Sequence, residues 1–166
     1  MPSQRWVAAW IGIGSNLQDP PAQVSRAIAA LRRLPRTRFG RASSLYWNPP
    51  MGPPGQPDYV NAVAGLLTRL DARELLAALQ AIERAAGRER AAGLRWGPRV
   101  LDLDLLSYGP RRIAEPGLRV PHPGIAERNF VLLPLLEVAP ELLIPGLAPL
   151  ARLAAAVGQN GLRRLD

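Results

Sequence analysis

Two aspartates, Asp102 and Asp104, are separated by a single residue in the segment Val-Leu-Asp-Leu-Asp-Leu at positions 100–105. In a β-strand alternate side chains share a face, so both carboxylates would lie together, with Cα atoms about 6.5 to 7 Å apart. This spacing suits two-metal phosphoryl-transfer sites, whose ions are about 3.5 to 4 Å apart. An ordinary exposed strand is the alternative, but Asp is poor in strands and two like charges repel each other. The pair therefore favours a metal-dependent catalytic site.

The composition restricts the metal that such a site could hold. The chain has no Cys and a single His, His122, which excludes thiolate sites and a multi-histidine zinc site within one chain. A site built mainly on carboxylates favours a hard cation such as Mg²⁺. His122 lies between two prolines and could donate a hydrogen bond to a phosphate oxygen, although a structural role stays open.

A glycine- and arginine-rich segment precedes the acidic pair. Its cations are Arg88, Arg90, Arg95 and Arg99. Guanidinium groups match phosphate geometry, and cations beside a metal site suit a nucleoside triphosphate. A solvated basic loop is the alternative. The net charge is +8, and all 21 basic residues are Arg. This use of Arg either favours phosphate partners or reflects a GC-rich genome. Because Lys is absent, a Walker A loop is excluded, and Gly-Ser-Asn at 14–16 is expected to form a tight turn.

Tyr59 and Asn61 would share one face of a strand, which places an aromatic ring beside an amide that both donates and accepts hydrogen bonds. This combination suits a planar heterocycle with hydrogen-bonding edges. The proline-rich residues 48–54 would stiffen the preceding loop and present backbone polar groups. An ordinary core position is the alternative for Tyr59.

Helices and strands that position these residues follow from apolar periodicity and from end signals. Asp19 and Pro20 start one helix, which Pro35 closes, and Asp71 starts another with Glu74 in capping-box position. Strands are predicted over residues 6–13, 39–47, 59–70 and 100–108, and helical segments after residue 123. The order βαββαβ predicts an α+β fold of the ferredoxin-like kind. Its antiparallel sheet would carry helices on one face and additional C-terminal helical segments, with residues 1–166 in a single domain.

These motifs in this order resemble the 6-hydroxymethyl-7,8-dihydropterin pyrophosphokinases of folate synthesis. The similarity runs from Ile-Gly-Ile-Gly-Ser-Asn-Leu at 11–17 to Pro-Leu-Leu-Glu-Val-Ala-Pro-Glu-Leu at 134–142. Its most specific parts are Arg-Trp-Gly-Pro-Arg at 95–99, Leu-Asp-Leu-Asp at 101–104 and Val-Pro-His-Pro at 120–123. The resemblance implies a ferredoxin-like fold and an enzyme that transfers the terminal pyrophosphoryl group of ATP to the pterin hydroxymethyl oxygen, releasing AMP.

The resemblance also implies a role for each matching residue. Asp102 and Asp104 would hold two Mg²⁺ ions, with Asp104 also helping to deprotonate the alcohol. Tyr59 and Phe130 would sandwich the pterin ring, and Asn61 would recognise its edge. The implied pterin site comprises Asn48, Met51, Tyr59, Asn61 and Phe130. The implied phosphate-binding arginines are Arg88, Arg90 and Arg99. The implied ATP site comprises Glu83, Arg90, Trp96, Arg99, Leu105, His122 and Arg128. Gly117 and Arg119 stand where some members carry adenine-contacting Arg and Thr.

A basic ferredoxin-like RNA-binding module without catalysis is the competing interpretation. It is disfavoured because such modules carry aromatic residues on a central strand, whereas residues 100–104 carry acids that would repel a phosphate backbone. We expect ATP and the pterin to be the partners, with no nucleic acid and no membrane, since no apolar run reaches the roughly 18 residues of a membrane span. The start of the chain lacks the pattern of a signal peptide. We therefore expect a cytoplasmic protein, and a monomer.

Overall fold

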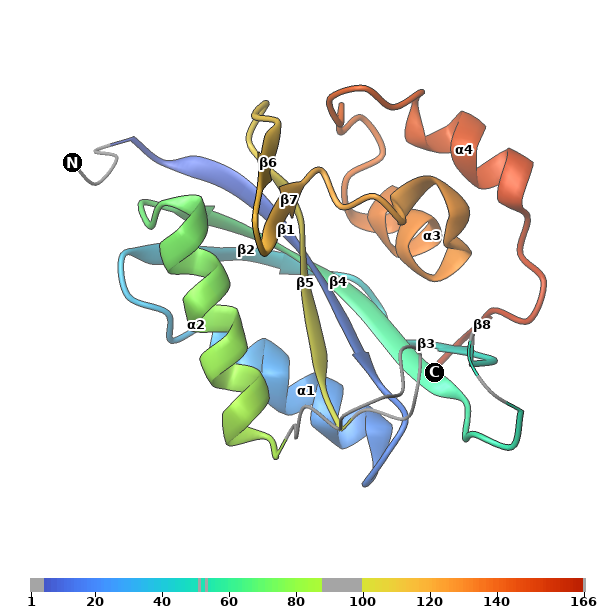
Figure 1. Cartoon of the computed structure of the whole chain (residues 1–166). Coiled ribbons are helices and arrows are strands. Elements are labelled where there is room, and N and C mark those ends of the chain that lie inside the picture. The colour runs from blue at the N-terminus through green and yellow to red at the C-terminus, as the bar shows by residue number, and fades with distance from the viewer. Residues whose placement is uncertain (1–4, 51, 53, 88–99, 166) are drawn as a thin grey trace.

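A central antiparallel sheet organises the computed structural model, which describes residues 5–50, 52, 54–87 and 100–165. The sheet has the strand order β5-β1-β4-β3-β8, and β2 also pairs with β4 (Figure 1). Its strands are β1 (Val7–Ser15), β2 (Thr37–Ala42), β3 (Tyr46–Asn48), β4 (Tyr59–Thr68), β5 (Asp102–Tyr108) and β8 (Arg163–Arg164). A separate hairpin is formed by β6 (Ile113–Glu115) and β7 (Leu118–Val120).

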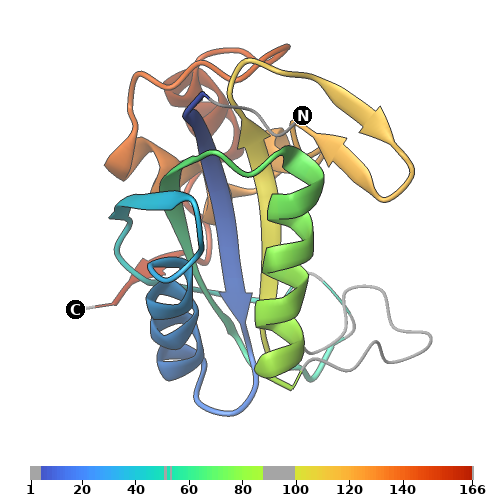
Figure 2. The same ribbon diagram turned by 90° about the vertical axis from the view of Figure 1, so that its left-hand side faces the viewer.

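The helices lie on both faces of this sheet. They are α1 (Pro20–Leu31), α2 (Ala72–Ala85), α3 (Asn129–Val138) and α4 (Leu150–Val157), with a short 3-10 helix η1 (Ile125–Glu127) before α3. Figure 2 shows α1 and α2 side by side in front of the sheet, with the C-terminal helices behind it. The α+β prediction is confirmed, and the additional C-terminal segments cover the face opposite to α1 and α2. No helix in the described ranges combines the length and apolar character needed to cross a bilayer.

Local signals set the helix starts that the sequence predicts. The Asp19 carboxylate accepts a hydrogen bond from the backbone N–H of Ala22, and Pro20 occupies the first helical position of α1. Asp71 and Glu74 form the reciprocal capping box of α2. Both predicted starts are therefore confirmed, while α1 ends at Leu31, before Pro35.

The strand predicted over residues 39–47 is wrong as one continuous strand, because the chain divides it into β2 and β3. At Ser43 the backbone N–H still bonds the Val63 carbonyl at 2.8 Å, but the Ser43 hydroxyl accepts the hydrogen bond of the Val63 N–H at 2.9 Å. A serine oxygen thus takes the place of a backbone carbonyl and lets the chain leave the ladder. Propensity alone did not indicate this exchange.

The two faces of the sheet differ in character. Against α1 and α2 the strands present buried apolar side chains, including Ile11, Ile13 and Leu103. On the opposite face, Val63 and Leu106 pack with α3 and α4 in a second core. The part of this second face that α3 does not cover carries the glycines and polar residues of the candidate site.

Candidate active site

The predicted catalytic and acceptor-binding residues form a row across three neighbouring strands. Asp102 on β5 pairs with Gly14 on β1, and Gly14 pairs with Asn61 on β4. Directly paired residues of antiparallel strands point to the same face. Asp102 and Asn61 therefore lie on one face of the sheet, separated by a residue that has no side chain.

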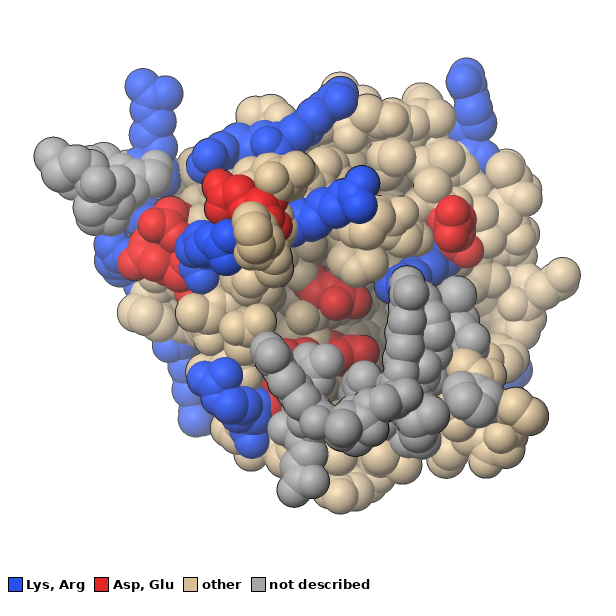
Figure 3. All heavy atoms as spheres, viewed as in Figure 1, with Lys and Arg blue, Asp and Glu red and all other residues tan. Residues whose placement is uncertain are grey.

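Asp104 lies one step further along the same face, opposite Gly12. Leu101, Leu103 and Leu105 point into the core beneath α1 and α2 and are almost fully buried, which confirms the predicted alternation. Both aspartates keep intermediate exposure. Figure 3 shows acidic atoms within a hollow of this face, over β5 as oriented in Figure 1. The carboxylates are thus presented together and remain open to a ligand.

The side chain of Asn61 leaves no room for a side chain at Gly14. A Cβ atom there would lie 2.7 Å from Asn61 Oδ1, closer than real Cβ contacts, and 3.7 Å from Cδ1 of Tyr59. The second distance also places the Tyr59 ring on the same face as Asn61, as the strand alternation predicts. The expectation of a turn at residues 14–16 is wrong for Gly14 and Ser15, because both continue β1 and pair with Asn61 and Val60 of β4. Cross-strand pairing of this kind is not visible in the local sequence.

We expect Gly14→Ala to weaken binding of the heterocyclic substrate about 10- to 100-fold, because the methyl group displaces the Asn61 amide and small misplacements are costly. Titration of the pterin against the purified variant measures the effect. In an Asn61→Ala background the same substitution should add little, because the clashing oxygen is gone. A full additive loss in the double variant would contradict the explanation.

Asn61 and Asn48 form a buried amide pair. Asn61 Nδ2 donates to Asn48 Oδ1, and Asn48 Nδ2 donates to the Pro49 carbonyl at 3.1 Å. Nearby, the buried Asn16 donates to the Pro57 carbonyl at 3.1 Å and to Gln56 Oε1 at 3.3 Å. These bonds join the end of β1 to the segment that precedes β4, and so fix the approach to Tyr59. Asn16 is a second residue whose role the sequence did not reveal.

His122 and Arg128 approach Asp104 from beside the sheet. The backbone N–H of His122 donates to the Leu106 carbonyl at 2.8 Å, which attaches the segment to β5. Nε2 of His122 then lies 3.9 Å from Asp104 Oδ1, and a guanidinium nitrogen of Arg128 lies 4.0 Å from Oδ2. The predicted phosphate-binding histidine and arginine therefore both border the acidic pair.

The histidine is a neutral donor at neutral pH. Burial, together with the nearby Arg128 guanidinium, lowers the pKa of His122 to about 4. Nδ1 accepts a hydrogen bond from the Gly124 N–H at 3.0 Å, so the proton of the neutral ring is on Nε2. That N–H is on the side of Asp104, where a phosphate oxygen could accept it.

Phe130 lies in the first turn of α3, and the Arg128 guanidinium carbon is 5.8 Å from the centroid of its ring. The other end of α3 is anchored to β3 and the residues before it. Glu137 accepts hydrogen bonds from the Tyr46 hydroxyl at 2.5 Å, from the Ser44 N–H at 2.8 Å and from the Ser44 hydroxyl at 3.1 Å. Burial alone would raise the pKa of Glu137, but these bonds outweigh it and lower the pKa below its ordinary value. The anchor holds α3 against the sheet.

Tyr46→Phe should lower the free energy of unfolding by about 1 to 2 kcal/mol at neutral pH, because Glu137 loses one buried donor. Burial and the hydrogen bond to Glu137 raise the pKa of Tyr46 from 10.0 to about 12. Between these pH values the unfolded chain loses the proton while the folded one keeps it, so this contribution is complete below pH 10 and is lost as pH rises. Denaturant titrations from pH 9 to 12 should show a steeper fall for the wild type than for the variant. Parallel pH profiles would contradict the assignment.

Glu83 and Leu105, two residues of the predicted ATP site, are buried, unlike the two carboxylates. Glu83 on α2 is buried, and its Oε2 accepts a hydrogen bond from the backbone N–H of Leu103 at 2.9 Å. The Leu105 side chain is buried in the core beneath α1 and α2, on the face opposite to Asp102 and Asp104. The contacts of Glu83 and Leu105 with a nucleotide stay predictions.

Several predicted residues lie outside the described ranges. They are Arg88, Arg90, Arg95, Arg99, Trp96 and Met51. In the part of the chain that the structure describes, no three His, Cys, Asp or Glu residues are grouped so that they could hold a metal ion. Two carboxylates on one face nevertheless fit Mg²⁺, which takes only one or two protein carboxylates and completes its shell with water and phosphate oxygens.

The sequence of this chain is similar to those of a known protein family. A model of the 7,8-dihydro-6-hydroxymethylpterin-pyrophosphokinase family matches residues 10–140. A protein of Pseudomonas aeruginosa named 2-amino-4-hydroxy-6-hydroxymethyldihydropteridine pyrophosphokinase is 47% identical over 156 residues, which cover 94% of this chain and 95% of the relative. A protein of the same name from Haemophilus influenzae is 45% identical over 139 residues, covering 84% of this chain and 86% of the relative.

Solved structures support the fold. A crystal structure of Plasmodium falciparum HPPK-DHPS with pterin and p-hydroxybenzoate superposes with a TM-score of 0.73 at 11% identity. The match covers 96% of this chain and 47% of that one, so this chain spans about half its length. At this identity the likeness shows the fold alone, whereas the sequence matches over most of the chain show the family. The chain belongs to the 7,8-dihydro-6-hydroxymethylpterin pyrophosphokinase family.

Proposed function

We infer that this protein transfers the pyrophosphoryl group of ATP to the hydroxymethyl group of 6-hydroxymethyl-7,8-dihydropterin. The products are AMP and the pterin diphosphate, and the reaction belongs to folate biosynthesis. Family membership supports the activity. The observation that supports this site for the activity is the row Asp102–Gly14–Asn61. In this row an aspartate suited to a metal-dependent phosphate transfer lies near an amide suited to a heterocycle.

In the proposed mechanism, the two ends of the row Asp102–Gly14–Asn61 bind different substrates. On the acceptor side, Asn61 and backbone groups around Asn48 and Met51 orient the pterin, while Tyr59 and Phe130 hold its two faces. Positioning of this kind turns transfer between two substrates into a reaction of prealigned atoms. The buried Asn48 and Asn61 are fixed before the substrate binds, which keeps the entropic cost of recognition low.

On the donor side, Asp102 and Asp104 would hold two Mg²⁺ ions, which supply Lewis-acid stabilisation of charge on the phosphate oxygens. His122 donates a hydrogen bond from its Nε2–H to a phosphate oxygen, and Arg128 adds a fixed positive charge next to Asp104. Asp104 also helps to remove the proton of the attacking hydroxyl. We assign further phosphate contacts to Arg88, Arg90 and Arg99, with Trp96, Glu83 and Leu105 bordering the nucleotide.

We also propose that residues 1–166 act as one catalytic domain and that the protein works as a monomer in the cytoplasm, where ATP is available. Binding of nucleic acid is not part of this function. The alternative of an RNA-binding module is not favoured, because acids occupy the exposed face of β5 and the family is enzymatic.

The decisive assay combines the purified protein with ATP, Mg²⁺ and 6-hydroxymethyl-7,8-dihydropterin, and separates the nucleotide products by chromatography. We expect one AMP for each pterin consumed. ADP as the product would indicate an ordinary kinase. Absence of ATP consumption, together with salt-dependent binding of mixed RNA in a gel-shift assay, would favour the binding module.

A further inference from the structure

Glu83 is a buried acid that contacts the metal-binding strand through its backbone. It lies near the end of α2, and its side chain and backbone together are only 4% exposed. Its carboxylate accepts the hydrogen bond of the Leu103 N–H at 2.9 Å. Leu103 is the residue between Asp102 and Asp104, so the contact falls at the centre of the acidic pair.

The position of β5 explains why this N–H needs a partner. Within the described residues, β5 is the edge strand of the sheet and pairs with β1 on one side. A backbone N–H that points away from β1 has no partner in the ladder, and a buried N–H without a partner costs free energy. α2 packs against this edge, and Glu83 supplies the acceptor from it.

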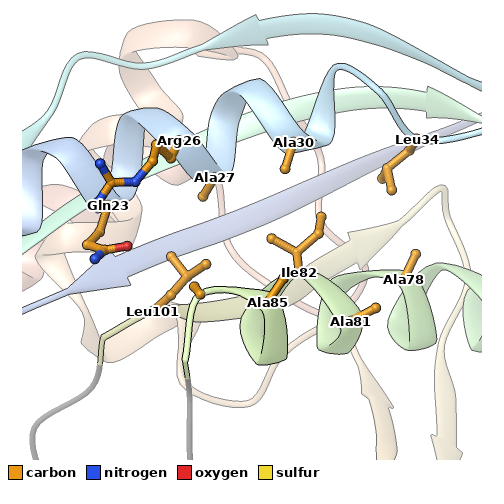
Figure 4. Close-up of a pocket in the computed structure, with 11 residues that line it drawn as sticks. Gln23, Arg26, Ala27, Ala30, Leu34, Ala78, Ala81, Ile82, Ala85 and Leu101 are labelled. Carbon is orange, nitrogen blue, oxygen red and sulfur yellow. The ribbon is translucent and has the colours of Figure 1, made fainter.

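Among the described residues, α2 also presents apolar side chains near the start of β5. Figure 4 shows Ile82 and Ala85 of α2, with Leu101 beside them, lining a groove between α1 and α2. The groove has a volume of about 470 Å³. Apolar contacts are not directional, and the ladder with β1 holds this part of β5 from one side, so Glu83 adds a directional contact from the other side. A charge-assisted hydrogen bond is directional and roughly twice as strong as a neutral one. Burying a carboxylate is costly unless it is hydrogen-bonded, and the Leu103 N–H satisfies one of its oxygens.

We propose that Glu83 is a positioning residue for the metal site: by holding the Leu103 N–H, it sets the relative direction of the Asp102 and Asp104 side chains. The inference rests on the proposed function. The Leu103 N–H belongs to the peptide that follows Asp102, and a rotation of that peptide changes how the two carboxylates face each other. Metal ligands must be held within about 0.5 Å and 10 to 20° of the productive geometry.

Two conservative variants separate the effect of side-chain length at position 83 from the effect of its charge. Glu83→Asp keeps the charge but withdraws the carboxylate by one methylene, whereas Glu83→Gln removes the charge but keeps an oxygen at the same reach. We expect Glu83→Asp to weaken binding of Mn²⁺, used as a probe for Mg²⁺, about 10- to 100-fold, and Glu83→Gln to stay within about threefold of wild type. The measurement is electron paramagnetic resonance of free Mn²⁺ with protein and α,β-methylene-ATP, which requires no turnover. Titration of each variant with the analogue in the absence of metal ion separates a lost nucleotide contact of Glu83 from a change at the metal site.

Leu79→Ala provides the control for a general loss of stability. Leu79 is a fully buried residue of the same helix, so the variant should lower the melting temperature yet leave Mn²⁺ affinity unchanged. Wild-type Mn²⁺ affinity in Glu83→Asp would overturn the inference. So would a larger loss in Glu83→Gln than in Glu83→Asp, because charge rather than the backbone contact would then matter. Failure of the wild type to form AMP would instead count against the proposed function, since the metal-binding comparison does not depend on it.

Discussion

Asp102→Ala or Asp104→Ala should abolish AMP formation, with kcat lowered about 10³-fold or more while the fold and most pterin affinity are retained. In the proposed mechanism the two carboxylates hold the metal ions that stabilise charge developing during transfer, so their loss falls on the rate rather than on ground-state binding. Neither residue is part of the core, and each removal relieves repulsion between like charges. Product chromatography, pterin titration and thermal melting measure the three expectations.

Glu115→Ala is the matched control for the acidic pair. Glu115 is an exposed acid on the separate hairpin, where it forms an ion pair with Arg73, so the substitution changes the net charge equally but lies outside the proposed site. Its turnover should equal that of the wild type. Near-normal AMP formation in either aspartate variant would refute the metal assignment, and a lowered melting temperature would point to a structural role instead.

Asn61→Ala should weaken pterin binding about 100-fold or more while leaving the affinity for an ATP analogue nearly unchanged. Asn61 is buried beside the empty position at Gly14 and is held by Asn48, so its amide is fixed towards the space where the heterocycle would lie. A site built to hydrogen-bond a polar edge loses about 10² or more when that partner is removed. Calorimetric titration with the pterin and, separately, with α,β-methylene-ATP measures both affinities.

Asn160→Ala is a suitable comparison, because Asn160 is exposed in the C-terminal segment and only its backbone carbonyl accepts a described hydrogen bond, from Asn129. This variant should bind both ligands normally. If Asn61→Ala lowered stability and both affinities in parallel, Asn61 would be a structural partner of Asn48 rather than a recognition residue. Unchanged pterin affinity would exclude it from the acceptor site.

The two largest expected effects thus fall on strands that are not adjacent. Gly14 of β1 separates them, and its missing side chain leaves the space through which donor and acceptor could meet. The Gly14→Ala and Asn61→Ala variants therefore test one side of this space, and the aspartate variants test the other. Glu83 acts indirectly, through its hydrogen bond with the Leu103 N–H between the two aspartates.

Local features were predictable from the sequence because their causes lie within a few residues. Alternation along a strand places Asp102 and Asp104 on one face and the flanking leucines on the other. The capping box of Asp71 and Glu74 depends on a spacing of three residues, and it forms as predicted. Composition alone excluded thiolate metal sites and Walker A loops, because the chain contains neither Cys nor Lys. The family resemblance then supplied the substrates, which alternation and capping could not indicate.

The tertiary structure decided what depends on contacts between distant parts of the chain. Register between β1, β4 and β5 places Gly14 between Asn61 and Asp102, residues that are 47 and 88 positions away from it in the chain. Packing of α2 on the edge strand brings Glu83 to Leu103, and docking of residue 122 on β5 brings His122 to Asp104. Ser43 replaces a ladder bond only because Val63 lies opposite it. Within a strand, the sequence by itself determined which side chains share a face, because alternation follows from local backbone geometry. Only the folded sheet determined which side chains meet, because strand register is set by the packing of the whole core.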